Sequence, residues 1–421
     1  MNAMDVSKEL LQFIDESPTP FHAVANAEAM LKEAGFEKLV DQQIVAGGKY
    51  YETRNSSSII AFQIPENGFE GFRVVSSHSD APGFKIKEDP EMKVSGRYVK
   101  LNTERYGGLV LFTWMDRPLS AAGRVIVKEN GKLVQKLVNF DKDMLVIPNV
   151  AIHYHRELND GFKPNPQVDM LPLMAMDQEC TLKKLCAQQL GVNEEDILGS
   201  DLFVYNRDKG RIMGADDSLI GAPRLDDLQC AFATLKGFLA AKPEKYVSVY
   251  ALFDNEETGS STKQGANSPF INDIIDDVAE SFGIGVRGKK QLIANSFMIS
   301  ADNAHALHPN HPEKYDSINH SFLNGGVVLK FSGSQKYTTD GCSAAVVRDI
   351  CKENNIKLQN QANRSDIAGG STLGNILTAH VGIPAADVGL PQFAMHSAFE
   401  TAGVEDTKAL VDLVNCFLSG I

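Results

Sequence analysis

The sequence runs Val247-Ser248-Val249-Tyr250-Ala251-Leu252-Phe253 and then directly Asp254-Asn255-Glu256-Glu257-Thr258-Gly259-Ser260. The first seven residues are largely apolar, rich in β-forming types and without a helical period, so they predict a buried strand. This strand delivers Asp254, Glu256 and Glu257 at its carboxyl end, the edge where α/β sheets bind ligands. Clustered carboxylates repel one another unless a cation or shared protons relieve the repulsion. The stretch therefore indicates either a cation site at a sheet edge or, as the simpler alternative, a solvated acidic loop.

Length and composition indicate a soluble globular protein. The chain has 421 residues, which corresponds to two or three domains, with 43% hydrophobic and 23% charged residues. Lys and Arg number 41 and Asp and Glu 54, so the net charge is −13. Binding to phosphates is driven by basic patches, so this charge argues against nucleic acid or an anionic membrane as the main partner.

The lack of a recognisable targeting signal and the pattern of cysteines predict a cytoplasmic protein. The first residues lack a basic segment followed by an apolar one, and no uncharged apolar run approaches the length that spans a bilayer. The cysteines are thinly spread and form no Cys-x-x-Cys pair, which predicts reduced, mostly buried thiols. They are Cys180, Cys186, Cys230, Cys342, Cys351 and Cys416.

The pattern along the chain predicts an α/β domain interrupted by an insertion. A helical pattern up to Gly35, with a break at Ser17–Pro20, is followed by strand-like segments. From about residue 89 short strand-like segments follow closely, among them Leu109–Trp114, and the α/β pattern resumes at Arg224. We therefore predict one domain from residues 1–88 and 224–421, and an inserted β-rich domain at residues 89–223.

Ligand-type side chains recur where predicted strands end. His78 and Asp80 follow one strand, and a carboxylate at this spacing can hold one imidazole nitrogen and leave the other for a metal. Asp302 follows a second strand and His396 a third. Asp226 and Asp227 open a helical pattern, where one of the two could bridge a pair of metals. Each has an ordinary alternative: a surface turn for the residues at strand ends, and a favourable charge at a helix N-terminus for Asp226.

Together these residues suit a catalytic metal better than a structural one. Imidazole and carboxylate ligands fit Zn²⁺, or Mn²⁺ and Co²⁺, and the absence of matching Cys ligands favours catalysis. Two ions sharing a bridging carboxylate need about five protein ligands, and such a pair activates water and polarises a carbonyl. One further carboxylate must take the proton of the water and pass it on. Glu256, beside Glu257, is the candidate.

Across essentially its whole length the chain resembles the M18 family of metallopeptidases, the aspartyl aminopeptidases. The opening Ser17–His22 is similar to that of the family. The order and spacing of the other motifs match as well. These motifs are His78-Ser79-Asp80, Arg224-Leu225-Asp226, Asp254–Ser260, Ala301-Asp302-Asn303-Ala304-His305 and Ala394-Met395-His396-Ser397.

The resemblance implies a ligand set for two divalent ions, Zn²⁺ or alternatively Mn²⁺ or Co²⁺. It implies that His78 and Asp302 bind one ion. Glu257 and His396 would bind the other, and Asp226 would bridge the two.

The resemblance also implies roles around the metals. Glu256 would be the general base and then the general acid, and Asp80 would orient His78. His153, in the insertion, is similar to a histidine that reaches the active site of a neighbouring subunit. Lys330 and His305 resemble positions that contact substrate.

The fold implied by the resemblance is a zinc-peptidase α/β domain, a mixed sheet flanked by helices, interrupted by a β-rich dimerisation domain. Its members assemble through dimers into dodecamers that enclose a chamber, and they release single N-terminal residues, often Asp or Glu, from small peptides. Two alternatives remain open. A deacylase-type amide hydrolase on the same scaffold would prefer N-acylated substrates, and a non-catalytic assembly or cargo protein would not need an intact ligand set or Glu256.

Overall fold

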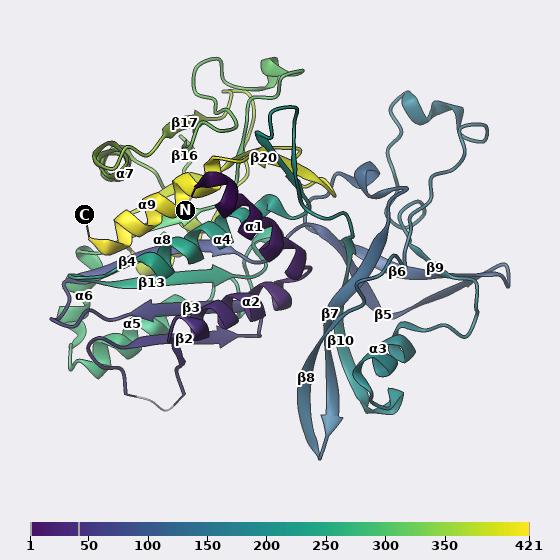
Figure 1. The fold of residues 1–421 in the computed structure, drawn as a ribbon, viewed down its shortest axis with the longest axis horizontal. Coiled ribbons are helices and arrows are strands. Elements are labelled where there is room, and N and C mark those ends of the chain that lie inside the picture. Colours follow the sequence, from purple (N-terminus) through teal and green to yellow (C-terminus); the bar gives the residue numbers. More distant parts are fainter. Residues whose placement is uncertain (1, 41–42, 421) are drawn as a thin grey trace. The chain divides into compact units, whose positions relative to one another are not determined.

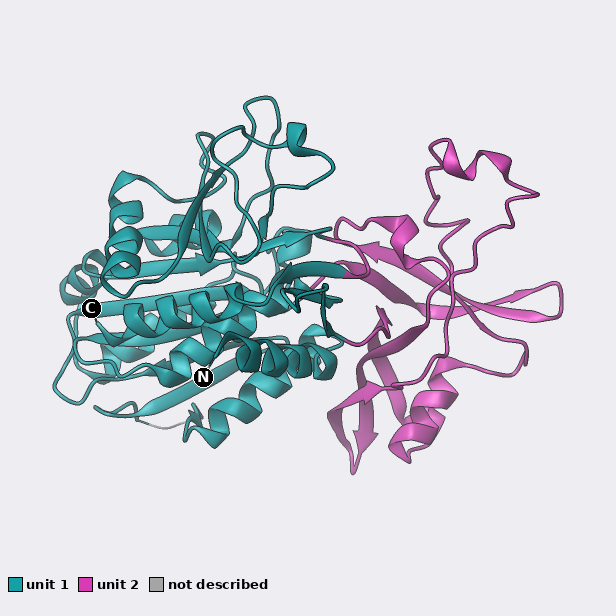
Figure 2. Ribbon diagram, turned by 45° about the horizontal axis from the view of Figure 1, so that its top comes forward, with its two compact units in different colours: residues 1–80, 210–395, 400–421 teal, residues 81–209, 396–399 magenta. Residues whose placement is uncertain are grey.

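A computed structural model describes residues 2–40 and 43–420. The chain forms two compact units (Figure 2). The larger consists of residues 1–80, 210–395 and 400–421, and the smaller of residues 81–209 and 396–399. These units are defined by compactness, and the domain boundaries predicted after residues 88 and 223 stay a prediction.

The larger unit contains the mixed α/β sheet that the sequence predicts (Figure 1). Its strands lie in the order β1 (Glu37–Lys38), β2 (Lys49–Arg54), β3 (Ser58–Gln63), β13 (Tyr246–Phe253), β4 (Gly71–His78), β14 (Phe297–Ala301), β18 (Ala385–Gly389), β16 (Val327–Phe331) and β17 (Leu358–Ala362). Strand β13, the predicted buried strand, runs antiparallel to β3 and parallel to β4.

Both faces of β13 are buried, which explains its near-continuous apolar sequence. Tyr250 and Leu252 pack into the core on one face, and Val249, Ala251 and Phe253 pack into the core on the other. Helices cover both cores. One face carries α2 (Pro20–Glu33), α4 (Leu225–Ala240), α7 (Gly341–Glu353) and α9 (Asp406–Ser419), and the other α5 (Phe270–Ser281), α6 (Val286–Ala294) and α8 (Leu373–Val381).

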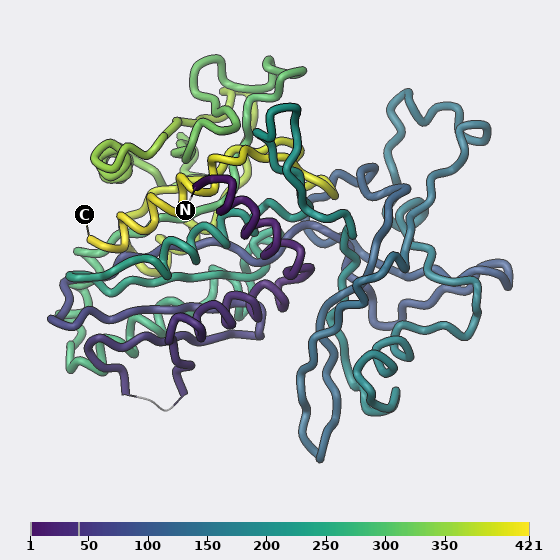
Figure 3. The backbone as a smooth tube through the Cα atoms, in the orientation of Figure 1, coloured from purple at the N-terminus to yellow at the C-terminus, as the bar shows by residue number. Residues whose placement is uncertain are grey.

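The remaining helix of the larger unit, α1 (Ala3–Glu16), lies beside α9, so segments near the two ends of the described chain pack together (Figure 3). A small second sheet has the order β11 (Arg211–Met213), β12 (Leu219–Ala222), β20 (Glu400–Gly403), β19 (Pro391–Phe393) and β15 (Ala304–His305). No helix in the described part of the chain is both long enough and apolar enough to pass through a bilayer.

Strand direction gathers the predicted site at one edge of the main sheet. Strands β13, β4, β14 and β18 are mutually parallel, so their carboxyl ends lie together. Phe253, the last residue of β13, pairs with His78, the last residue of β4. The chain segments that follow these strands therefore share the edge at which α/β sheets bind ligands.

The smaller unit is β-rich. Its sheet has the order β8 (Lys132–Asn139), β7 (Leu119–Glu129), β10 (Ile197–Asn206), β5 (Gly83–Val94), β6 (Tyr98–Tyr106) and β9 (Leu173–Ala175), and helix α3 (Leu182–Leu190) packs into the same core. The predicted strand at Leu109–Trp114 is wrong, because Leu111–Trp114 forms a 3₁₀ helix. Trp114 is buried edge-on against Phe84, with ring centroids 5.3 Å apart. The side chain of Trp114 therefore packs into the core from a 3₁₀ helix and not from a strand.

The break between α1 and α2 contains a partly buried histidine. Pro20 begins α2, and Thr19 Oγ1 lies 2.8 Å from His22 Nδ1. Burial, helped by the charge of Arg224, lowers the pKa of His22 to about 4. The folded protein therefore keeps this imidazole neutral at mildly acidic pH.

We expect His22→Gln to reduce the loss of stability on acidification. In the unfolded chain His22 has its ordinary pKa of about 6.5, so below that pH the unfolded state binds the proton and is favoured. The stabilisation is present above about pH 6.5 and is lost as the pH falls towards 4. Urea denaturation at about pH 7 and about pH 5 measures the difference, with the exposed His311→Gln as control. Equal losses in the wild type and His22→Gln would contradict the assignment.

Candidate metal centre

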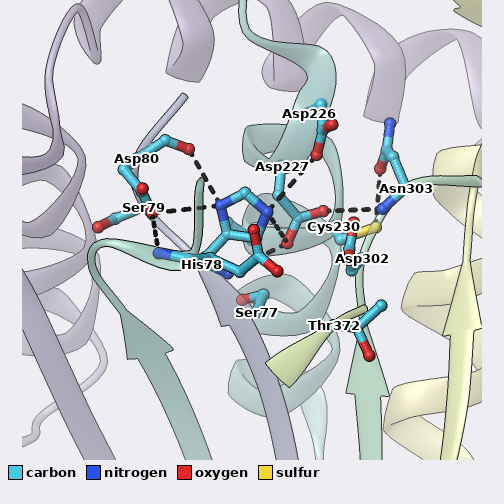
Figure 4. A network of polar contacts seen from close by, with 12 residues as sticks. Ser77, His78, Ser79, Asp80, Asp226, Asp227, Cys230, Asp302, Asn303 and Thr372 are labelled. Carbon is cyan, nitrogen blue, oxygen red and sulfur yellow. Dashed lines mark hydrogen bonds and ion pairs between the residues drawn. The ribbon is translucent and has the colours of Figure 1, made fainter. Parts of the chain in front are cut away.

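His78 presents one ring nitrogen to Asp80 and the other to Asp226 (Figure 4). Its Nδ1 lies 3.0 Å from the backbone oxygen of Asp80 and 3.4 Å from the carboxylate of Asp80. A carbonyl oxygen can only accept, so Nδ1 carries a hydrogen, and Nε2 is the nitrogen left for a metal to bind once its proton is displaced. Nε2 lies 3.5 Å from Oδ1 of Asp226. The imidazole is thus held in the orientation that a metal ligand requires.

Asp226 and Asp227 do not take part in the first helical turn of α4. Their backbone angles are non-helical, and the peptide bond between them is cis. Both side chains are buried, with exposed fractions of 3% and 0%. Both are thus buried acidic groups in a non-helical stretch at the start of α4.

The predicted ligands of the larger unit converge. Ligand-type atoms of His78, Asp226, Asp227 and Asp302 all lie within 4.8 Å of one another, and His78 forms a second such group with Glu256 and Glu257. Asp227 is the neighbour of Asp226, and the family resemblance assigned the bridging position to Asp226 alone. A buried imidazole among carboxylates is a nitrogen and oxygen donor set that suits Zn²⁺, Mn²⁺ or Co²⁺.

The electrostatics of the cluster favour a cation. Burial lowers the pKa of His78, but the carboxylates of Asp227, Asp226 and Asp80 outweigh it and raise the pKa well above its ordinary value. Burial, with the charges of Asp302 and Glu257, raises the pKa of Glu256 to about 9. The raised pKa values mean that His78 and Glu256 bind protons more tightly, because the nearby carboxylates concentrate negative charge. A divalent cation would relieve the repulsion between these carboxylates in the same way.

Asp80 also fixes the turn that carries the glutamates. Its two carboxylate oxygens accept hydrogen bonds from the backbone N–H groups of Glu256, at 3.1 Å, and Glu257, at 3.2 Å. These residues begin the 3₁₀ helix Glu256–Thr258 that follows β13. The same carboxylate therefore contacts the ring of His78 and sets the position of the acidic turn.

The two predicted substrate-contacting residues of the larger unit differ in environment. Lys330, on β16, is 3% exposed, donates to the backbone oxygen of Asn303 at 2.9 Å and lies 3.7 Å from the carboxylate of Asp302. Its charge is therefore engaged beside a predicted metal ligand. His305 is exposed and lines a cavity of about 300 Å³ together with Lys314 and other residues.

Two predicted site residues belong to the smaller unit. His396 Nδ1 lies 2.7 Å from the carbonyl oxygen of Gly108, so Nδ1 donates to that oxygen. His153 is exposed in the segment between β8 and the 3₁₀ helix Arg156–Asn159. Their functional roles stay predictions.

Some buried polar residues around the cluster were missed by the sequence analysis. Glu400, 2% exposed at the start of β20, accepts a hydrogen bond from the backbone N–H of Asp226 at 3.1 Å. Asn303 donates to Gln392 at 2.7 Å. In the sequence, such residues are marked only as polar residues within an otherwise apolar segment. That pattern is too common to identify a functional site.

Comparisons with known proteins place the whole chain in one family. The family model described as Aminopeptidase I zinc metalloprotease (M18) matches residues 13–418. A relative named probable M18 family aminopeptidase 2, from Clostridium acetobutylicum, is 44% identical over 418 residues, which cover 96% of each chain.

Solved structures show the same fold. A chain of the cryo-EM structure of the Ape4 and Nbr1 complex is similar with a TM-score of 0.95 and 31% identity, over 99% of this chain and 86% of that one. The mApe1 dodecamer of S. cerevisiae is similar with a TM-score of 0.88 and 26% identity, over 99% and 97% of the two chains. The chain therefore belongs to the M18 family of zinc metalloproteases and is a metallo-aminopeptidase.

Proposed function

We propose that this enzyme uses two divalent ions to release single N-terminal residues, preferentially Asp or Glu, from small peptides. The observation that carries the proposal is the convergence of a buried imidazole and several carboxylates at the carboxyl edge of the parallel strands. Zn²⁺ is the proposed ion, with Mn²⁺ or Co²⁺ as alternatives, because the donors are nitrogen and oxygen atoms.

The proposed ligand set follows the family resemblance and uses residues with the required donors. His78 and Asp302 hold one ion, Glu257 and His396 hold the other, and Asp226 is shared. When bound, the metal pair supplies an activated water and a polarised substrate carbonyl. Asp80 keeps Nε2 of His78 available, because its backbone oxygen accepts the Nδ1 hydrogen.

Glu256 is the proposed proton carrier. It accepts the proton of the attacking water and delivers it to the leaving amine as the peptide bond breaks. Its half-buried position beside Glu257 and the hydrogen bond from its backbone N–H to Asp80 support this role. Burial raises the pKa of Glu256, and a carboxylate with a raised pKa is a stronger base towards the attacking water.

The acidic preference is supported by positively charged side chains in the cavity that His305 lines. The cavity of about 300 Å³ that His305 lines also includes Lys314 and Arg364, which suit a carboxylate side chain. Lys330 is retained as a substrate contact on the family resemblance, although its charge already faces Asp302.

Self-association is part of the proposal. The S. cerevisiae relative is a dodecamer, which supports dimers of this chain that build a dodecamer, with residues 89–223 as the dimerisation domain. In such an assembly His153 would contribute to the active site of a neighbouring copy. A cytoplasmic location is proposed from the scattered cysteines, which are unpaired thiols.

A panel of aminoacyl substrates tests the proposed function. We expect cleavage of substrates with a free amino group and a higher kcat/KM for N-terminal Asp or Glu than for neutral residues. His305→Ala should narrow that difference without loss of metal, because the side chain is exposed and stands outside the metal-ligand group. Cleavage of N-acylated substrates alone would favour a deacylase, and zinc binding without cleavage of any substrate would favour a non-catalytic role.

A further inference from the structure

Asp227 joins the ends of two neighbouring strands. One of its carboxylate oxygens accepts a hydrogen bond from the backbone N–H of His78 at 3.1 Å, and the other accepts one from the backbone N–H of Asn303 at 3.2 Å (Figure 4). His78 ends β4, and Asn303 follows β14 by two residues. The two strands are parallel neighbours in the sheet. A single fully buried carboxylate therefore spans the two segments that carry His78 and Asp302.

The Asn303 end of this connection is held from several sides. Oδ1 of Asn303 accepts from the thiol of Cys230 at 2.9 Å, and its Nδ2 donates to Gln229 at 3.0 Å and to Gln392 at 2.7 Å. Asp227, Gln229 and Cys230 all belong to α4. Side chains of α4 thus form several hydrogen bonds with the segment after β14, and Asp227 also forms one with the end of β4.

Geometry distinguishes Asp227 from its neighbour Asp226. Nε2 of His78 lies 3.5 Å from Asp226 but 4.0 Å from Asp227. Both oxygens of Asp227 already accept backbone hydrogen bonds, and a carboxylate can accept two such bonds at once, whereas an amide of the same shape offers one oxygen.

We infer that Asp227 is a positioning residue that sets the spacing of His78 and Asp302 through their backbones and supplies no ligand atom. The inference rests on the proposed metal centre. It explains why two adjacent aspartates follow Leu225: one faces the metal position, and the other holds the strand ends that bear the ligands.

Asp227→Asn tests the inference. The amide keeps one acceptor oxygen and places an N–H donor against the second backbone N–H group. One of the two hydrogen bonds is therefore lost, and the side chain no longer connects the two strand ends. We expect the affinity for Zn²⁺, measured by competition with a chromogenic chelator, to fall by about 10- to 100-fold, as for other groups that orient metal ligands. Metal content at saturating Zn²⁺ should stay at the wild-type level, with kcat lowered and KM little changed.

Asp406→Asn is the matched control. Asp406 is also buried, and its two carboxylate oxygens accept from the backbone N–H groups of Asn324, at 2.7 Å, and Gly326, at 2.8 Å. This variant should lower the unfolding temperature to a similar degree but leave the affinity for Zn²⁺ unchanged.

Two results would overturn the inference. If Asp227→Asn bound Zn²⁺ as tightly as the wild type and only its unfolding temperature fell, Asp227 would have a purely structural role. Loss of one bound Zn²⁺ at saturation would make it a ligand. If the wild-type enzyme itself bound no metal, the proposed function would fail rather than the role of Asp227.

Hydrogen exchange of the wild-type enzyme provides a test that does not depend on the folding of a variant. If Asp227 holds the strand ends, peptides that include His78 and Asn303 should remain protected after a chelator removes the metal. Exchange of these peptides at the rate of exposed loops in the metal-free enzyme would contradict the inference.

Discussion

Glu256→Gln should lower kcat by about 10²- to 10⁴-fold while the zinc content of the enzyme stays at the wild-type level. The amide has nearly the same shape, but it cannot accept the proton of the attacking water. The turn that carries the residue should keep its position, because it is held through backbone N–H groups that Asp80 binds. Steady-state kinetics and metal analysis of the same preparation measure the two quantities.

Glu257→Gln is the control for this substitution. Glu257 is the neighbouring carboxylate and a proposed ligand, so its replacement should reduce metal content together with activity. A Glu256→Gln enzyme with kcat near that of the wild type would remove Glu256 from the role of proton carrier. A joint loss of metal and activity would instead assign Glu256 to the ligand set.

Removal of the metal should abolish cleavage, with a loss of more than about 10³-fold, because neither the activated water nor the polarised carbonyl is then available. Zn²⁺, Mn²⁺ or Co²⁺ added back to the dialysed enzyme should restore activity. The unfolding temperature should also fall on removal, since a ligand present at about 1,000 times its dissociation constant stabilises the folded state by about 4 kcal/mol. Assays and thermal denaturation before and after chelation measure both effects.

Mg²⁺ provides a control for the specificity of reactivation. It prefers oxygen ligands in near-octahedral geometry, so an imidazole-containing site should bind it poorly. Full activity in an enzyme shown to contain no metal would exclude the proposed mechanism.

Local sequence was sufficient to predict those parts of the site that depend on strand ends. Strand β13 was predictable because both of its faces are buried, so almost every residue in it is apolar. The spacing of His78 and Asp80 places both at the end of one strand, and their contact in the structure agrees with that prediction. Parallel pairing then brings the ends together, which follows from the α/β pattern.

Features that depend on distant contacts were not predictable. The buried Glu400 reaches the backbone of Asp226 from a strand 174 residues further along the chain, and no local pattern marks such a contact. The conformation at Asp226 and Asp227 departs from the helix that their neighbours predict, because both carboxylates are directed to His78 and the strand ends. Leu109–Trp114 was assigned to a strand because an apolar run does not reveal whether its backbone pairs with a neighbour.

The two contacts of Asp80 have a consequence for attempts to redesign this enzyme. The carboxylate of Asp80 lies 3.4 Å from Nδ1 of His78, beside the contact of that nitrogen with the backbone oxygen of Asp80, and it also accepts the backbone N–H of Glu256. In the proposed centre, a substitution at residue 80 would therefore change the surroundings of a metal ligand and the position of the proton carrier together. Variants selected for a different ion are better sought at positions that touch only one of these two functions.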